Sequence, residues 1–341
     1  MTDLMPAARW YAPRDVRTEQ VPVPVPLPGQ VLVAVERTGL CGSDLEEYRE
    51  GPVAIPPSAV PITLGHEVVG TVVECPGGEI ALGTRVVPDV VVGCGRCWWC
   101  ARHEEGLCPD LLVRGQQQDG GLARFMAADA ATCVRVPDDL DVEVAAFAEP
   151  AAVAVRALRK AGDLSGAVVC VQGAGTVGQL IVQAALAAPA TRVVAVDPVP
   201  GRRKLAQGFG AVACAPDEAV DVVRSLSGGR GADVVLECAG VPSAPAASVA
   251  VSRRGATVVL VGFRHATLAL PWLDVVLGER RLVGTAAHVW DTDVAPAVAL
   301  LARGVLDPRP LHTATVPLGR APEAFERLDT DPSALKLLVA P

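Results

Sequence analysis

Residues 166–188 read GAVVCVQGAGTVGQLIVQAALAA, an apolar run followed by glycines and then by a longer apolar stretch. The first run has the length of a buried strand and the last the length of a helix. Gly173, Gly175 and Gly178 stand between them in the pattern G-x-G-x-x-G. In such a turn the first glycine permits the tight bend, the second lets the backbone approach a pyrophosphate, and the third lets the helix pack on the sheet. We therefore predict a dinucleotide site, with the phosphates at the helix start beside Thr176 and Val177.

The segment beyond this unit continues the alternation of strands and helices. Residues 191–197, 232–240 and 256–263 are strand-like runs rich in Val and Leu, and residues 202–210 form a helical stretch ending at a glycine. Near-continuous apolar strands alternating with helices indicate a parallel sheet covered on both faces.

Asp197 closes the second strand, nineteen residues beyond Gly178. An acid at this place accepts hydrogen bonds from the hydroxyls of an adenosine ribose. Its charge would also repel a 2′-phosphate, so we expect NAD. Arg202 and Arg203 follow closely and would soften that repulsion, which leaves NADP as the alternative. A glycine turn that binds nothing is disfavoured because strand, helix and acid are all in place.

The chain has 341 residues, which predicts about two domains at roughly 100–200 residues each. Residues 1–150 hold short strand-like runs and turns, whereas residues 151–290 carry the alternating pattern. The tail, residues 291–341, has two helical and two strand-like runs, and we expect it to return to the first domain. The predicted fold class is α/β, with a β-rich domain beside a doubly wound parallel-sheet domain.

Composition narrows the class of protein. The net charge is −8 and no block of Lys and Arg appears, so we expect no nucleic-acid partner. The longest apolar runs are strand length, so we expect no membrane span. No secretion signal is visible, and we expect a cytoplasmic protein. In that reducing compartment the ten cysteines are thiols or metal ligands rather than disulfides.

Four of the cysteines stand close together in residues 93–108, GCGRCWWCARHEEGLC. The spacing C-x2-C-x2-C-x7-C is a closed set of four thiolates, which is typical of a structural zinc site because no position remains for water or substrate. Disulfides and bare thiols are the alternatives. The four residues are Cys94, Cys97, Cys100 and Cys108.

Ligand-type residues also occur in three short motifs outside this cysteine lobe. TGLCGSDLEEY contains Cys41 and Ser43, LGHEVVG contains His66 and Glu67, and FAEPAAVAV contains Glu149. Thiolate, imidazole and carboxylate are all zinc ligands, and three protein ligands with one open position make a catalytic zinc site. Any one of these residues alone would be read as an ordinary packed residue.

Taken together, CGSD, GHEVVG, the four-cysteine lobe, the glycine pattern and AEP resemble the zinc-dependent medium-chain dehydrogenase/reductase superfamily. The resemblance covers the whole chain. It implies a GroES-like catalytic domain (1–150 and 291–341, with the lobe at 93–108), a Rossmann domain (151–290), and an active site in the cleft between them. It also implies two zinc ions per chain, NAD, and a homodimer or homotetramer.

The resemblance assigns Cys41 and His66 as catalytic zinc ligands. Glu67 is then either a ligand that exchanges with water or a carboxylate behind the ligands. Glu149 matches the glutamate of the polyol and threonine dehydrogenase branches, where many simple alcohol dehydrogenases have cysteine. Ser43 is placed to begin a proton relay.

The stretches CGSDLEEYREGPVAIP, ITLGHEVVG and QQQDGGLARFM look most like the butanediol and sorbitol dehydrogenase branch. Relatives there carry a histidine at the end of the relay where this chain has Glu46, so the relay ends at Glu46 or in water. The implied activity is hydride transfer between NAD and a secondary alcohol, with 2,3-butanediol and acetoin as the first expectation. A sugar alcohol or an aminocyclitol is the alternative, and a zinc-free reductase or a non-enzymatic protein of the same fold is disfavoured by the intact motifs.

Among the other histidines, His103 is not expected to be a ligand because four thiolates already complete the lobe. His265, His288 and His312 have no ligand partner at short spacing. His288 and Trp290 either line the pocket or pack in the core.

Overall fold

The computed structural model of the chain describes residues 3–188, 192–263 and 267–341. The chain divides into two compact units, and each is described by itself. The first comprises Met1–Ala152, Ala287–Gly304 and Pro308–Pro341, and the second Val153–Ala286 and Val305–Asp307. Helix α3 (Ala148–Ala161) leads the chain from the first unit into the second.

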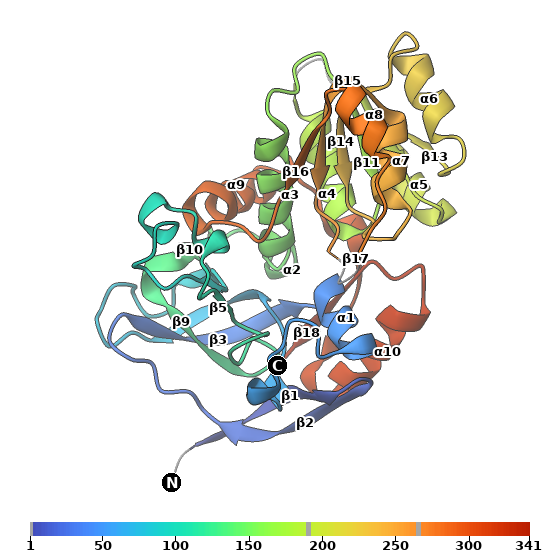
Figure 1. Cartoon of the computed structure of the whole chain (residues 1–341). Coiled ribbons are helices and arrows are strands. Elements are labelled where there is room, and N and C mark those ends of the chain that lie inside the picture. The colour runs from blue at the N-terminus through green and yellow to red at the C-terminus, as the bar shows by residue number, and fades with distance from the viewer. Residues whose placement is uncertain (1–2, 189–191, 264–266) are drawn as a thin grey trace. The chain divides into compact units, whose positions relative to one another are not determined.

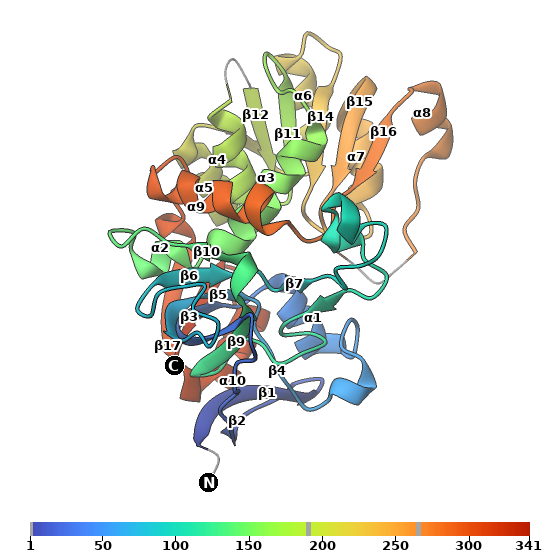
Figure 2. The same ribbon diagram turned by 90° about the vertical axis from the view of Figure 1, so that its left-hand side faces the viewer.

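The second unit is built on a six-stranded sheet in the order β13-β12-β11-β14-β15-β16. Every neighbouring pair is parallel. Figure 2 shows β12, β11, β14, β15 and β16 side by side in this order. Numbered along the chain, the order is 3-2-1-4-5-6, that of the Rossmann fold, with its switch point between β11 and β14. The strands are β11 (Val168–Gln172), β12 (Arg192–Val196), β13 (Val212–Cys214), β14 (Ala232–Glu237), β15 (Ser252–Leu260) and β16 (Arg281–Gly284).

Helices connect these strands and bury their apolar sides. All five residues of β11 are buried, which explains why its sequence is apolar without alternation. The predicted parallel sheet between helical layers is confirmed. The helices are α4 (Thr176–Leu186), α5 (Pro200–Phe209), α6 (Ala219–Leu226), α7 (Ala244–Val251) and α8 (Trp272–Leu277).

The first unit is β-rich. Its largest sheet follows the order β10-β6-β5-β3-β18-β17, with β9 also paired to β3, and a smaller sheet follows β2-β1-β4. The strands are β1 (Leu4–Ala12), β2 (Asp15–Pro22), β3 (Gln30–Gly39), β4 (Ile62–Thr63), β5 (Glu67–Glu74), β6 (Arg85–Pro88), β7 (Val91–Val92), β8 (Leu112–Val113), β9 (Phe125–Asp129), β10 (Cys133–Arg135), β17 (His312–Pro317) and β18 (Lys336–Ala340).

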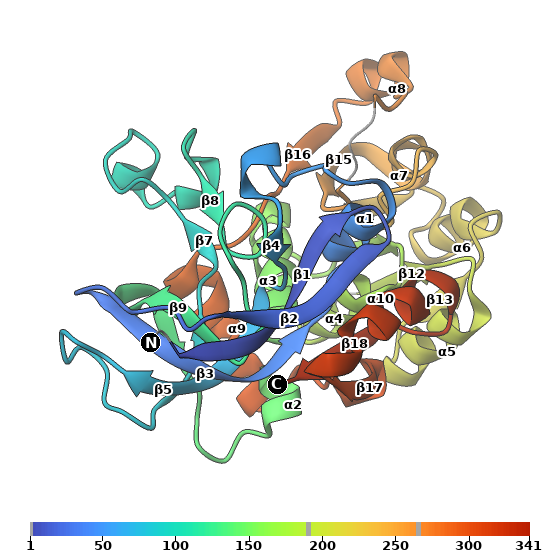
Figure 3. The ribbon, with the colours of Figure 1, turned by 90° about the horizontal axis from the view of Figure 1, so that it is seen from below.

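The end of the chain lies beside its beginning within this unit. Strand β18 is antiparallel to β3, and Figures 1 and 3 show the red C-terminal elements next to the blue N-terminal ones. The helices of this unit are α1 (Gly42–Glu50), α2 (Val142–Ala145), α9 (Ala295–Ala302) and α10 (Ala321–Thr330). Residues Trp290–Val294 form one π-helical turn, here called η5.

Helix α1 is fixed against α10 by an aromatic contact. The rings of Tyr48 and Phe325 stack with their centroids 5.4 Å apart, and Phe325 is fully buried. Trp10 and Leu40 belong to the same core. Because Cys41 is the residue that begins α1, this core also fixes the position of the Cys41 side chain.

In the described part of the chain, none of the helices combines the length and the apolar character needed to cross a bilayer.

Candidate active site

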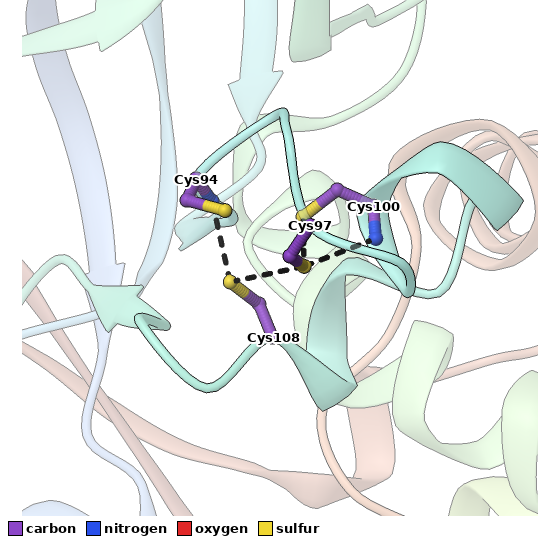
Figure 4. Close-up of side chains that lie close together, drawn as sticks. All are labelled: Cys94, Cys97, Cys100 and Cys108. Atoms are coloured by element: carbon purple, nitrogen blue, oxygen red, sulfur yellow. Dashed lines mark hydrogen bonds between the residues drawn. The ribbon is translucent and has the colours of Figure 1, made fainter.

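The four lobe cysteines converge on one point (Figure 4). Their sulfur atoms all lie within 4.8 Å of one another, with Cys97 Sγ 3.4 Å from Cys100 Sγ and 3.8 Å from Cys108 Sγ. Four Zn–S bonds of about 2.3 Å in tetrahedral geometry place sulfurs about 3.8 Å apart. The donor set therefore fits a structural zinc ion, and the four residues are free thiols rather than disulfides.

Backbone amides point at the lobe sulfurs. The N–H group of Cys94 donates to Cys108 Sγ, and the N–H group of Cys100 donates to Cys97 Sγ. Amide hydrogen bonds, that of Arg96 first, lower the pKa of Cys94 to about 7, whereas burial raises the pKa of Cys100 to about 12. The loop thus favours a thiolate at Cys94, which a metal ligand requires.

His103 is engaged by carboxylates rather than by sulfur. Its Nδ1 lies 3.0 Å from Glu105 Oε1 and its Nε2 2.6 Å from Asp291 Oδ1. The ring also meets Trp290 edge-on. Trp98 and Trp99 contact each other edge-on, and the Arg102 guanidinium lies 3.7 Å from the centre of the Trp98 ring.

The start of α1 presents the first group of catalytic candidates. Asp44 Oδ2 accepts the backbone N–H of Cys41, and Asp44 Oδ1 lies 3.4 Å from His66 Nδ1. The other ring nitrogen, His66 Nε2, lies 3.3 Å from Ser43 Oγ. Burial alone would lower the pKa of His66, but Asp44 and Cys41 raise it well above its usual value. A carboxylate behind Nδ1 is the arrangement that leaves Nε2 to a metal.

Glu67 is held by a lysine that the sequence did not point to. Lys336 Nζ donates to Glu67 Oε1 at 2.6 Å and to Oε2 at 2.5 Å, and also to the Leu40 carbonyl. A Cβ on Gly39 would lie 2.0 Å from Glu67 Oε2, so the carboxylate needs a glycine there. Burial alone would lower the pKa of Lys336, but Glu67 raises it. Both oxygens of Glu67 are bonded to one lysine, an arrangement that favours the second of its two predicted roles, a carboxylate behind the ligands.

Glu149, in the first turn of α3, is held by a histidine. Its Oε1 lies 3.1 Å from His288 Nε2, and His288 Nδ1 lies 3.4 Å from Asp89 Oδ1. Burial alone would raise the pKa of Glu149, but the hydrogen bond from His288 lowers it. Glu149 is therefore favoured as a carboxylate.

These side chains form one electrostatic neighbourhood within the first unit. The Glu67 and Glu149 charges act on each other and on His66, and Lys336 acts on Cys41 and Glu149. A thiol, an imidazole and carboxylates are thus gathered in one buried neighbourhood, and groups of these kinds are zinc ligands. In the described ranges only the lobe cysteines bring three or more ligand atoms within 4.8 Å of one another. Cys41, His66 and Glu149 do not form such a group among the described residues.

The glycine loop leaves room for a ligand in the second unit. A Cβ on Gly173 would lie 2.7 Å from the backbone N of Ala239, and a Cβ on Gly178 would lie 1.9 Å from the carbonyl oxygen of Gly173. The fold itself therefore requires these two glycines. A Cβ on Gly175 would meet nothing within 4 Å. Gly175 begins α4, and the first turn of a helix directs backbone N–H groups outward at its start. The loop therefore fits a pyrophosphate.

Asp197 is buried directly after β12. Its Oδ2 accepts the Ala174 N–H and its Oδ1 the Val199 N–H, both at 2.8 Å. Arg202 Nη1 lies 3.9 Å from Asp197 Oδ2, and Arg203 donates to the Asp197 carbonyl. Asp197 thus shapes the glycine loop, a role not predicted, and each of its oxygens retains a second lone pair for a ribose hydroxyl.

Several predicted residues have less definite surroundings. Glu46 is half-buried on α1. His312 Nε2 lies 3.0 Å from Thr315 Oγ1 and its Nδ1 lies 3.3 Å from Glu143 Oε2, and His265 lies outside the described residues. Sequence reasoning missed Lys336, Asp89 and the contact of His288. The sequence carries no local signal for Lys336, which stands in the apolar run ALKLLVA, and the structure buries four consecutive positions of β18.

Comparisons with known proteins agree with this geometry. Residues 27–138 match the alcohol dehydrogenase GroES-like domain, and residues 176–303 match the zinc-binding dehydrogenase domain. The (R,R)-butanediol dehydrogenase of Bacillus subtilis is 32% identical over 99% of this chain and 100% of its own. The L-idonate 5-dehydrogenase (NAD(P)(+)) of Escherichia coli is 33% identical over 86% of this chain and 87% of its own.

Solved structures give the same result. The E. coli L-idonate 5-dehydrogenase structure covers 100% of this chain and 99% of its own, with a TM-score of 0.92 and 31% identity. A zinc-binding dehydrogenase of Sinorhizobium meliloti bound to NADP has a TM-score of 0.89 and 31% identity, over 99% of this chain and 100% of its own.

The chain therefore belongs to the zinc-dependent medium-chain dehydrogenase/reductase family, within its polyol dehydrogenase branch. It is an NAD(P)-dependent alcohol dehydrogenase, which sets aside the zinc-free reductase and the non-enzymatic protein.

Loss of one lobe cysteine tests the structural metal site. We expect Cys97→Ser to lose one zinc per chain and to lower the unfolding temperature by about 5 °C or more, because structural zinc contributes folding free energy directly. Zinc analysis and calorimetry measure both. Cys75→Ser is the matched control, since Cys75 donates only to Glu79 and lies outside the lobe. Unchanged zinc content in Cys97→Ser would contradict the assignment.

Proposed function

We propose that the chain oxidises a secondary alcohol beside a second hydroxyl to its ketone, using NAD and a zinc ion held by Cys41, His66 and Glu149. One observation carries this proposal: the two ligand candidates other than Cys41 each have a buried partner. The carboxylate of Asp44 lies beside His66, and the imidazole of His288 lies beside Glu149. When bound, zinc supplies a Lewis acid for the alcohol oxygen, and NAD supplies the hydride acceptor.

The residues of the chain handle the proton and hold the donors in place. Asp44 orients His66 through Nδ1, and Lys336 keeps Glu67 behind the ligands. Ser43 Oγ, 3.3 Å from His66 Nε2, takes the hydroxyl proton of the substrate and passes it toward solvent. Glu46, on the same helix, is the proposed end of that relay. Burial of the cluster excludes water from the reacting group.

The substrate class is proposed as a vicinal diol or polyol. The butanediol and idonate dehydrogenases are named for substrates with neighbouring hydroxyls, and Glu149 in place of cysteine supports the same branch. We propose 2,3-butanediol and acetoin as the first pair to test, with sugar alcohols and cyclitols as the alternative. The structural zinc at the lobe makes two zinc ions per chain, and the ten free thiols support a cytoplasmic location.

Metal content and turnover together test this function. We expect the wild type to hold two zinc ions per chain and to reduce NAD with at least one of the butanediol isomers, sorbitol-like polyols or cyclitols. Cys41→Ser is expected to lose one zinc and at least about 100-fold in kcat/KM, because the metal supplies several kcal/mol of transition-state stabilisation. It should keep the lobe zinc and NAD affinity. Full turnover in Cys41→Ser would overturn the assigned site, and Cys75→Ser again serves as the control.

The preference for NAD is proposed from the carboxylate of Asp197. Because Asp197 also accepts two backbone amides, Asp197→Ala would loosen the glycine loop and weaken both cofactors. Asp197→Asn removes the charge and keeps one acceptor oxygen, so it retains at most one of the two backbone hydrogen bonds, and the ratio of the two cofactor affinities is the informative quantity. We expect the ratio of NAD to NADP affinity to fall by about 10-fold in Asp197→Asn, which corresponds to about 1.4 kcal/mol. An unchanged ratio, measured by titration of nucleotide fluorescence, would reject the ribose role.

We also propose that the second unit pairs with another copy of the chain. Helix α8 exposes Trp272, Leu273, Val276 and Leu277, each more than half exposed, and large exposed apolar patches mark interaction sites. We expect light scattering to give a dimer or tetramer for the wild type and a smaller species for Trp272→Glu with Leu273→Glu. Leu82→Glu, at a 65% exposed leucine of the first unit, is the control. A monomeric wild type would contradict this proposal.

A further inference from the structure

His288 lies buried between two carboxylates that come from separate elements. Its side chain is 1% exposed. Its Nε2 lies 3.1 Å from Glu149 Oε1 on α3, and its Nδ1 lies 3.4 Å from Asp89 Oδ1, just after β6. Asp89 is itself fixed, because its Oδ1 accepts the Val91 N–H at 2.8 Å. A histidine that merely filled core space would not need an acid at each ring nitrogen.

The direction of the hydrogen bond follows from the chemistry of its partners. An ionised carboxylate only accepts, so His288 Nε2 carries the proton and donates to Glu149. This contact engages Oε1 of Glu149 and does not involve Oε2.

The backbone around His288 is also held in place. The Val289 N–H donates to Asp293 Oδ2 at 2.9 Å, and Asp293 is fully buried at the end of η5. Asp291 in the same turn bonds His103 of the cysteine lobe at 2.6 Å. The imidazole therefore approaches Glu149 from a fixed support.

We propose that His288 is a positioning residue: with Asp89 facing its Nδ1, it fixes the Glu149 carboxylate so that Oε2 faces the metal at Cys41 and His66. This inference rests on the proposed function, because it presumes that Glu149 is a ligand. Carboxylates that ligate metals are themselves hydrogen-bonded, and loss of such a partner costs about 10–100-fold in metal affinity.

Three variants separate positioning from packing. His288→Leu removes the donor and keeps an apolar volume. His288→Gln carries an amide N–H about as far from the backbone as Nε2, so it can still donate to Glu149, whereas His288→Asn carries its amide near the Nδ1 position. His312→Leu is the matched control, because His312 is a largely buried histidine of the same unit that faces Glu143 and Thr315 instead.

The measurements are zinc release to a chromophoric chelator and the visible spectrum after replacing the weaker-bound zinc with Co²⁺. We expect His288→Leu and His288→Asn to release one of two zinc ions at about 10–100-fold lower chelator concentration, with a shifted Co²⁺ band. His288→Gln should restore most of the affinity and the wild-type band. The lobe zinc should be retained in all variants, and Asp89→Asn should add nothing to His288→Leu.

The outcomes distinguish the inference from the proposed function. Wild-type zinc affinity and Co²⁺ spectrum in His288→Leu, with two zinc ions bound, would overturn the role of His288 and leave the zinc site standing. An equal loss in His288→Leu and His288→Gln would also overturn it, because that result assigns His288 to packing alone. A wild type that binds only the lobe zinc would overturn both.

Discussion

The first unit depends on balancing the charges that it buries around Cys41. Asp44, Glu67 and Asp89 are each at most 3% exposed, and an isolated carboxylate at such depth would cost several kcal/mol. Each one faces a cation or an imidazole: His66, Lys336 or His288. Glu149, slightly more exposed, shares His288 with Asp89. Removing any single partner would leave a buried charge uncompensated, so these residues are coupled rather than independent.

This balance explains why the end of the chain returns to its beginning. Lys336 pairs with Glu67 across 269 residues of sequence, and His288 pairs with Glu149 across 139. Strand β18 brings Lys336 to the end of β3, where Gly39 leaves space for the Glu67 carboxylate. The tail therefore supplies charge to the site as well as a strand to the sheet.

Sites built from residues close together in the sequence could be predicted, whereas contacts between residues far apart in the sequence could not. The lobe and the glycine turn were readable because their residues lie within a few positions of one another and their spacing fixes their geometry. The alternation of apolar runs predicted the parallel sheet, and the resemblance carried by the short motifs implied the GroES-like and Rossmann domains; both are correct. The short strands β13 and β16 were not identified, since three or four residues carry too little periodicity. Lys336, Asp89 and His288 could not be assigned to Glu67 and Glu149, because nothing along the chain encodes a contact between such distant residues.

The lobe and the catalytic cluster meet at one short segment. Residues 288–293 carry His288 toward Glu149 and Asp291 toward His103, and Asp89 stands just before the strand that leads into the lobe. A folded lobe thus supports both sides of His288. The side chains of His103 and Asp291 are each 40% exposed, so their ion pair contributes little to stability at physiological salt. The contacts of His288 are buried and poorly screened by salt. Support from the lobe is therefore expected to come mainly from the backbone around Asp89 and only slightly from the exposed ion pair.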